Sequence, residues 1–148
     1  MRFAFVSDLH LDESEFTALQ QFIAFLDGPA RAATALYVLG DLFEVWLGDD
    51  DDDPARARVC AALRALTASG TAAFVMRGNR DVLLGRGFEA RTGATLLPDP
   101  VVVDFGGVRT LLTHGDLLCT DDRNYQEMRS LMRDRRWQRR LLALELAA

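Results

Sequence analysis

The sequence predicts an α/β fold in which helices cover a mostly parallel β-sheet. Three short apolar runs, 3–6, 35–39 and 72–76, each end shortly before an Asp or Asn, as strands buried on both faces do. Amphipathic helical segments separate these runs, and such alternation is typical of parallel sheets. The chain has 148 residues, 49% of them hydrophobic, which suits one folded domain and excludes disorder as its main state.

The helices are predicted from apolar spacing and from the residues that bound them. Residues 13–27 form one helix that the Gly28-Pro29 pair ends. Pro54 is well placed in the first turn of a second helix, which continues to Gly70. A shorter helical segment is expected over about 83–91. The acidic run between the second strand and the second helix is expected to be a solvated loop.

Two apolar segments late in the chain predict a β-hairpin. Residues 101–103 and 108–113 flank a turn with the sequence Phe105-Gly106-Gly107. The hairpin adds antiparallel strands, so we expect the sheet to be mixed. Beyond Asp122 the chain is expected to be helical and rich in arginine.

Charge and cysteine content narrow the class of protein. The net charge is −5, but from Arg123 onward seven arginines face three acidic residues. The acidic body argues against a general nucleic-acid binder, whereas the basic tail suits a membrane surface or a phosphorylated ligand. Cys60 and Cys119 fall at no metal-ligand spacing, and no secretory signal opens the chain. We therefore expect a cytoplasmic protein with reduced thiols.

Polar residues follow each predicted strand, at the edge where ligands of parallel sheets bind. The residues that offer an oxygen or imidazole there are Asp8, His10, Asp41, Asn79 and His114. Such ligands suit a divalent manganese, iron or zinc ion, and one carboxylate could bridge two ions about 3.5–4 Å apart. Taken singly, each residue also fits a helix cap, a turn former or a structural histidine. Their coincidence at four strand ends favours a metal site.

These residues form an ordered set of motifs that resembles a known family. Asp8-x-His10, Gly40-Asp41, Gly78-Asn79-x-Asp81 and His114-Gly115 resemble the motifs of the calcineurin-like metallophosphoesterases. Segments 7–11, 39–50, 78–81 and 114–122 are similar to the UDP-2,3-diacylglucosamine pyrophosphatases of lipid A biosynthesis. The resemblance implies an α/β fold made of a mixed β-sheet sandwich flanked by helices.

The resemblance also implies a set of site residues and a reaction. Asp8, His10 and Asp41 would hold one Mn²⁺, and Asp41, Asn79 and His114 a second, with Asp41 bridging. Asn79, Arg80, Asp122 and Tyr125 would contact the substrate. The reaction would be metal-dependent hydrolysis of UDP-2,3-diacylglucosamine to UMP and 2,3-diacylglucosamine 1-phosphate. Most relatives have His where this chain has Arg80; an arginine stays charged, so we expect Arg80 to stabilise phosphate oxygens rather than donate a proton.

The resemblance further implies a division of the chain and a location. Residues 1–122 would be the metallophosphoesterase core and residues 123–148 the start of a helical lid, in an enzyme bound peripherally to the cytoplasmic side of the inner membrane. The tail also fits an ordinary amphipathic helix.

One family motif is missing from this sequence. Relatives carry a Gly-His-x-His after the lid, whereas no histidine follows His114 here. We expect a C-terminally incomplete chain whose metals keep three protein ligands each. Two alternatives stay open: hydrolysis of another nucleotide pyrophosphate, and a catalytically silent protein that binds a nucleotide or a partner in the same cleft.

Overall fold

The computed structural model describes residues 1–50 and 52–143. The chain divides into two compact units, Met1–His114 and Gly115–Ala148, which are described separately. The predicted start of a lid at residue 123 falls within the second unit.

A parallel four-stranded sheet is the centre of the first unit. Its strands, in spatial order, are β1 (Phe3–Val6), β2 (Ala35–Val38), β3 (Ala72–Met76) and β4 (Thr95–Leu97). The first three confirm the predicted strands. β4 was missed because it has only three residues, too few to show a pattern.

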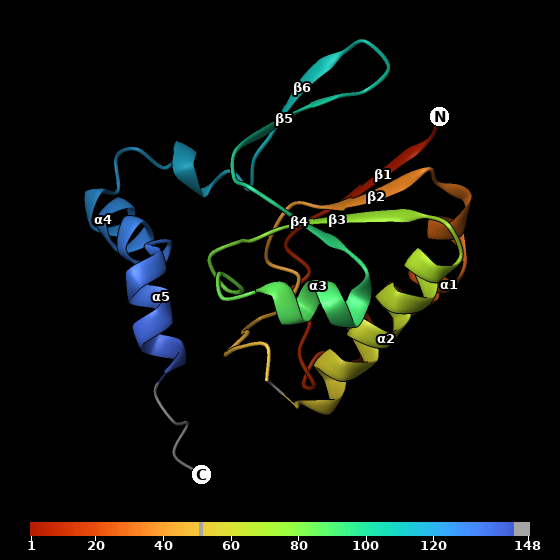
Figure 1. Ribbon diagram of the computed structural model, residues 1–148, viewed down its shortest axis with the longest axis horizontal. Helices are drawn as coiled ribbons and strands as arrows, with labels where there is room; N and C mark the ends of the chain where they lie inside the picture. The colour runs from red at the N-terminus through yellow and green to blue at the C-terminus, as the bar shows by residue number, and fades with distance from the viewer. Residues whose placement is uncertain (51, 144–148) are drawn as a thin grey trace. The chain divides into compact units, whose positions relative to one another are not determined.

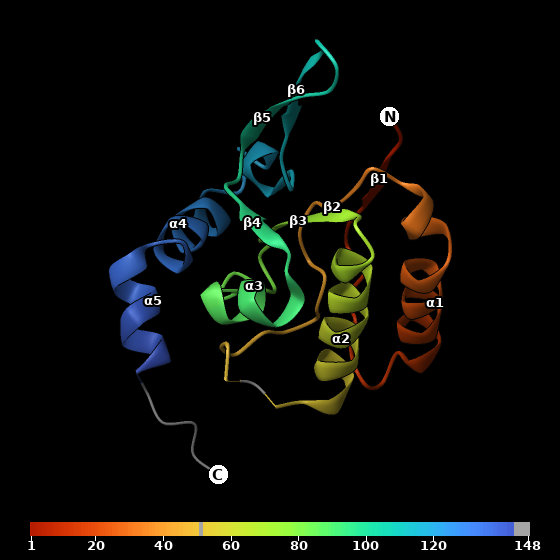
Figure 2. The ribbon, with the colours of Figure 1, turned by 45° about the vertical axis from the view of Figure 1, so that its right-hand side comes forward.

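Three helices lie on one face of this sheet (Figures 1 and 2). They are α1 (Phe16–Asp27), α2 (Pro54–Ala68) and α3 (Arg86–Thr92), with a short 3₁₀ turn at Pro29–Ala32. The Asp53 side chain caps α2 by accepting from the Arg56 amide at 2.9 Å. Gly93 ends α3 with a left-handed φ of 72°. The three helices confirm the predicted segments, with later starts for α1 and α3.

The predicted hairpin forms a sheet of its own. β5 (Val101–Asp104) and β6 (Arg109–Leu112) pair antiparallel and join neither edge of the parallel sheet in the described residues, so the expectation of one mixed sheet is corrected to two sheets. The reason is packing: the Phe105 ring contacts Tyr37 of β2 at a centroid distance of 5.3 Å. The hairpin therefore packs against part of the sheet face opposite the helices, which gives a two-sheet arrangement of the sandwich type that we expected (Figure 1).

The second unit is helical. It contains a 3₁₀ turn (Asp116–Leu118), α4 (Arg123–Met132) and α5 (Arg135–Leu142). The Asp134 side chain accepts from the amides of Arg136 and Trp137, so it starts a new helix where the sequence suggested a continuous one. The end of the predicted lid, residues 144–148, lies outside the described residues. No helix in the described part of the chain has the length and apolar character to cross a bilayer.

Candidate metal centre

The strand register brings the first two polar loops together. Val6 pairs with Val38, and Val38 with Val75, so β1, β2 and β3 end side by side. Beyond the strands the backbone contacts continue, because the carbonyl of Asp41 accepts from the amides of Leu9 (2.9 Å) and His10 (3.0 Å). The loop after β1 is thus fixed to the loop after β2.

Two glycines allow the third and fourth loops to approach. A Cβ on Gly78 would collide with the carboxylate and amide of Asp41, and one on Gly40 would collide with the His114 ring. Gly40 also has a φ of +105°, which favours glycine. These close approaches place Asn79 and His114 next to Asp41.

All five residues predicted to bind metal lie together. One ligand atom from each of Asp8, His10 and Asp41 falls within 4.8 Å of the others. On the other side of Asp41, the His114 Nε2 atom lies 3.7 Å from Asp41 Oδ2 and 3.2 Å from Asn79 Oδ1. Asp41 therefore lies between two groups of potential ligands, Asp8 with His10 on one side and Asn79 with His114 on the other.

The two imidazole rings present the same atom to this centre. The His10 Nδ1 lies 2.8 Å from a Glu44 carboxylate oxygen, and the His114 Nδ1 lies 2.9 Å from the Leu39 carbonyl. Both partners accept hydrogen bonds, so a proton on Nδ1 suits each ring, and for His114 the Asn79 Oδ1 atom is a second acceptor, 3.2 Å from Nε2. Each Nε2 lies 3.7 Å from the same oxygen, Asp41 Oδ2.

This donor set fits divalent cations. Carboxylate oxygens, an amide oxygen and imidazole nitrogens converge here, which is a set of ligand atoms that a divalent cation accepts. A shared transition-metal ion lies about 2.0–2.2 Å from each nitrogen or oxygen ligand, so atoms 3.7 Å apart can bind the same ion. The centre is suited to metal before any metal is bound.

Backbone strain is concentrated at the same place. Asp8, His10 and Asp41 have φ values of 53°, 47° and 51°, and they are the residues other than glycine with positive φ in the described chain. Such conformations cost on the order of 1–3 kcal/mol each and persist where the surroundings impose them. Here the strain aims three potential ligands at one point.

Asp81 is a site residue whose role the sequence did not reveal. It is fully buried, and its carboxylate accepts from the amides of Leu42 at 2.8 Å and Gly78 at 2.7 Å. Burial raises the pKa of Asp81 to about 6, and the Asp41 carboxylate adds to the rise while the backbone amides oppose it. Asp81 thus joins the loops that carry Asp41 and Asn79.

Further positioning contacts come from Asp99, which the sequence did not single out, and from the main chain of Arg80. The Asp99 carboxylate accepts from the amide of His114 at 3.1 Å and from the Thr113 hydroxyl at 2.8 Å. The Arg80 amide donates to Asp41 Oδ1 at 2.9 Å, which leaves Oδ2 directed at the rings. The Arg80 guanidinium is exposed and pairs with Glu44 at 3.2 Å.

The two other predicted substrate contacts lie in the second unit. The Asp122 side chain caps α4 by accepting from the Tyr125 amide at 2.9 Å. The Tyr125 hydroxyl donates to Asp116 at 2.9 Å, and burial together with this carboxylate raises the pKa of Tyr125 to about 12. Burial works to raise the pKa of Asp116, but hydrogen bonds from Tyr125 and Arg129 hold it below its ordinary value. Both predicted residues thus organise their own unit, and substrate contact stays a prediction.

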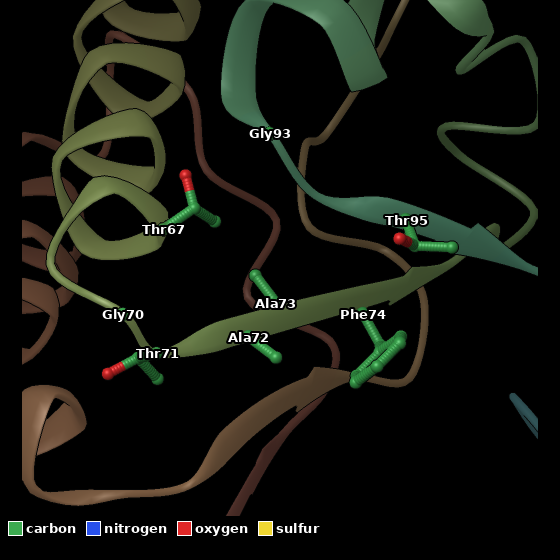
Figure 3. A pocket seen from close by; sticks show the side chains of 8 residues that line it. All are labelled: Thr67, Gly70, Thr71, Ala72, Ala73, Phe74, Gly93 and Thr95. Atoms are coloured by element: carbon green, nitrogen blue, oxygen red, sulfur yellow. The ribbon is translucent and has the colours of Figure 1, made fainter.

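Two cavities lie near opposite ends of the parallel strands, and the residues that line them differ in chemistry. One of about 550 Å³ opens beside the candidate centre, where His10 and Glu44 form part of its wall together with Asp12 and Glu15. A second, of about 210 Å³, lies where β3 and β4 begin and α2 ends (Figure 3). No titratable side chain lines the second, and its Thr67 hydroxyl already donates to the Thr92 carbonyl at 2.7 Å. Of these two cavities, only the first is lined by titratable side chains.

Comparison with known proteins gives a family match. The model of the calcineurin-like phosphoesterase superfamily domain matches residues 1–140. The chain is 52% identical over 143 residues to a UDP-2,3-diacylglucosamine hydrolase of Aromatoleum aromaticum, covering 97% of this chain and 58% of that protein. It is 51% identical over 147 residues to the protein of that name from Chromobacterium violaceum, covering 99% and 62%. The chain thus spans about three fifths of the length of these curated relatives.

Solved structures support the fold. A nuclease MPE from Pseudomonas putida matches with a TM-score of 0.53 and 20% identity, over 70% of this chain and 50% of that one. A protein of unknown function from Aquifex aeolicus matches with a TM-score of 0.51 and 18% identity, over 85% and 68%. At these identities the likeness concerns the fold alone.

Proposed function

Because the chain belongs to the calcineurin-like phosphoesterase superfamily, we propose that it carries the metal centre of a hydrolase acting on UDP-2,3-diacylglucosamine. The products would be UMP and 2,3-diacylglucosamine 1-phosphate, an intermediate of lipid A biosynthesis. The observation that carries the proposal is the convergence of two imidazole nitrogens on one Asp41 oxygen, at 3.7 Å each. Identity of about 50% to proteins named for this substrate supports the choice of substrate.

The proposal includes two Mn²⁺ ions. Asp8, His10 and Asp41 would hold one, and Asp41, Asn79 and His114 the other, with Asp41 bridging. When bound, such a pair of ions activates water at neutral pH and stabilises charge on the phosphate. Support comes from the two groups of ligand atoms on either side of Asp41.

The chain's own residues would bind and orient the pyrophosphate. The Arg80 guanidinium is exposed, permanently charged and next to the centre, so it is suited to stabilise the negative charge that develops on a phosphate oxygen. Asn79 would contact the same phosphate through its amide. Asp122 and Tyr125 are also proposed to contact the substrate.

The second unit would meet the lipid part of the substrate and the membrane. Met128, Leu131 and Leu142 are about half exposed on helices that also carry most of the chain's C-terminal arginines. Exposed apolar groups and positive charge on amphipathic helices suit acyl chains and anionic headgroups. We therefore place the protein at the cytoplasmic surface of the inner membrane as part of this proposal.

The experiment is a paired measurement of Mn²⁺ binding and UMP release by the purified chain. UMP release from UDP-2,3-diacylglucosamine that requires Mn²⁺ and is lost in Asp41→Asn would support the proposal. Faster hydrolysis of a simple nucleotide pyrophosphate would instead favour the alternative substrate. Tight Mn²⁺ binding without any hydrolysis would contradict the proposed activity and leave a silent binding protein.

A further inference from the structure

Glu44 stands between two functional side chains and uses a different oxygen for each. Its Oε2 lies 2.8 Å from His10 Nδ1, and its Oε1 lies 3.2 Å from an Arg80 guanidinium nitrogen. Glu44 follows Asp41 by three residues, and its amide donates to the Leu11 carbonyl at 3.2 Å. Its backbone is therefore anchored to the loop that carries His10.

The bond to His10 determines what that ring presents to the centre. A carboxylate only accepts, so the ring proton stays on Nδ1 and the Nε2 lone pair faces Asp41. The His10 side chain is 37% exposed, and packing alone does not fix its orientation. Without an acceptor at Nδ1, the neutral ring is free to place its proton on Nε2, where a metal ligand must have none.

The bond to Arg80 is of another kind. The Arg80 and Glu44 side chains are 52% and 41% exposed, and such surface pairs contribute only about 0–1 kcal/mol. Charge-assisted bonds from a guanidinium to phosphate are stronger and often bidentate. The Arg80 main chain is held separately by Asp41, so the guanidinium can leave Glu44 for a phosphate without disturbing the loop.

We propose that Glu44 is a positioning residue that fixes the proton and orientation of the His10 ring for cation binding, while its bond to Arg80 is exchangeable. The proposal rests on the metal centre proposed above. Glu44 is not one of the proposed metal ligands, but it would control the exposed ligand, His10. We expect loss of the hydrogen bond to His10 and loss of the ion pair with Arg80 to have different effects on metal binding.

The test measures Mn²⁺ affinity by electron paramagnetic resonance titration, and the His10 tautomer by ¹⁵N NMR of the metal-free protein at pH 8. Glu44→Ala is expected to weaken Mn²⁺ binding by about 10–100-fold, the usual effect of losing a partner of a metal-bound histidine. It should also convert the ring from one tautomer to a mixture. Glu44→Gln should restore the Nδ1–H tautomer and part of the affinity, because the amide oxygen still accepts.

Two controls separate positioning from charge. Glu15→Gln removes a carboxylate from the same cavity, and Arg80→Ala removes the other partner of Glu44. Both should change Mn²⁺ affinity by no more than about threefold, the size expected of exposed charges, and both should leave the His10 tautomer unchanged.

The outcomes distinguish this proposal from the one on which it rests. If Glu44→Ala retains the wild-type tautomer and affinity, the positioning role is overturned. If Glu15→Gln weakens binding as much as Glu44→Ala does, charge alone explains the effect and the role is also overturned. If the wild-type chain binds no Mn²⁺, the proposed metal centre fails, and the tautomer of the Glu44 variants still decides whether Glu44 positions the ring.

Discussion

The His10 and His114 sides of the candidate centre present the same atom to Asp41, but they are built differently. The His10 side chain is 37% exposed and is held by the Glu44 side chain, whereas that of His114 is 5% exposed and is held by the Leu39 carbonyl. A backbone carbonyl at the end of a central strand cannot move without the strand, but a side-chain carboxylate can rotate. The centre therefore combines one ligand fixed by the fold with one that side chains can adjust.

The largest effect should come from the residue that both sides share. Among the described residues, Asp41 is the carboxylate that lies 3.7 Å from both rings, so we expect Asp41→Asn to lower Mn²⁺ affinity by more than about 100-fold, beyond the loss typical of indirect partners. Asp12→Asn is the matched control, because Asp12 lines the neighbouring cavity but does not belong to the group of potential ligands. Titration with Mn²⁺ checks both, and equal affinities in the two variants would show that Asp41 is not shared.

Replacing each histidine in turn should show directly how the His10 side of the centre differs from the His114 side. His10→Ala and His114→Ala are both expected to weaken Mn²⁺ binding. In metal-free protein, only His114→Ala should lower the free energy of unfolding, by about 1–3 kcal/mol, because it removes a buried side chain and leaves the partly buried Leu39 carbonyl without its donor. Urea denaturation measures this difference. Equal free energies of unfolding in the two variants would contradict the distinction between a fixed His114 and an adjustable His10.

The Arg80→Ala variant tests whether Arg80 acts on the substrate without contributing to metal binding. Arg80→Ala should reduce turnover by more than about tenfold, since it removes a charged group that stabilises the phosphate. Its Mn²⁺ content should match that of the wild type, because the His10–Glu44 bond is retained. Metal analysis beside a kinetic assay gives the answer, and metal loss in the variant would reject this role.

A substitution in the second unit is expected to have the smallest effect on the candidate metal centre. The pKa of Asp116 is held below its ordinary value of 3.8, so its charged form stabilises the unit above that pH and the stabilisation is lost as the pH falls through the lowered value. In Asp116→Asn, the protection factors of α4 amides against hydrogen exchange should be lower at pH 7 and should lack the acid-induced loss that we expect of the wild type. Mn²⁺ affinity should not change. Protection factors in the variant that match the wild type both at pH 7 and below the ordinary pKa of Asp116 would contradict this account.

The sequence was sufficient to predict the strands other than β4, the helices on the sheet and the residues that meet at the strand ends. These predictions succeed because parallel strands must end at the same edge, and because Asp8, Asp41 and Asn79 follow strands that are apolar throughout. The family match agrees with the motifs that these residues form.

The contacts that position the site could not be predicted, because they join residues far apart in the chain. Asp81 reaches Leu42 across 39 positions, and Glu44 reaches His10 across 34. Asp49 corrects the expectation of a solvated acidic loop: its carboxylate accepts from the amides of Gly85 and Gly87 at the start of α3. Such partners depend on loop conformations, which no local pattern of residues specifies.

The central claim is that paired cations bind on either side of Asp41. Anomalous diffraction from crystals of the chain soaked in Mn²⁺ tests it most directly. Two peaks about 3.5–4 Å apart, one next to His10 and the other next to His114, are the expected result. A single peak among the cavity carboxylates, or none within bonding distance of Asp41, would contradict it.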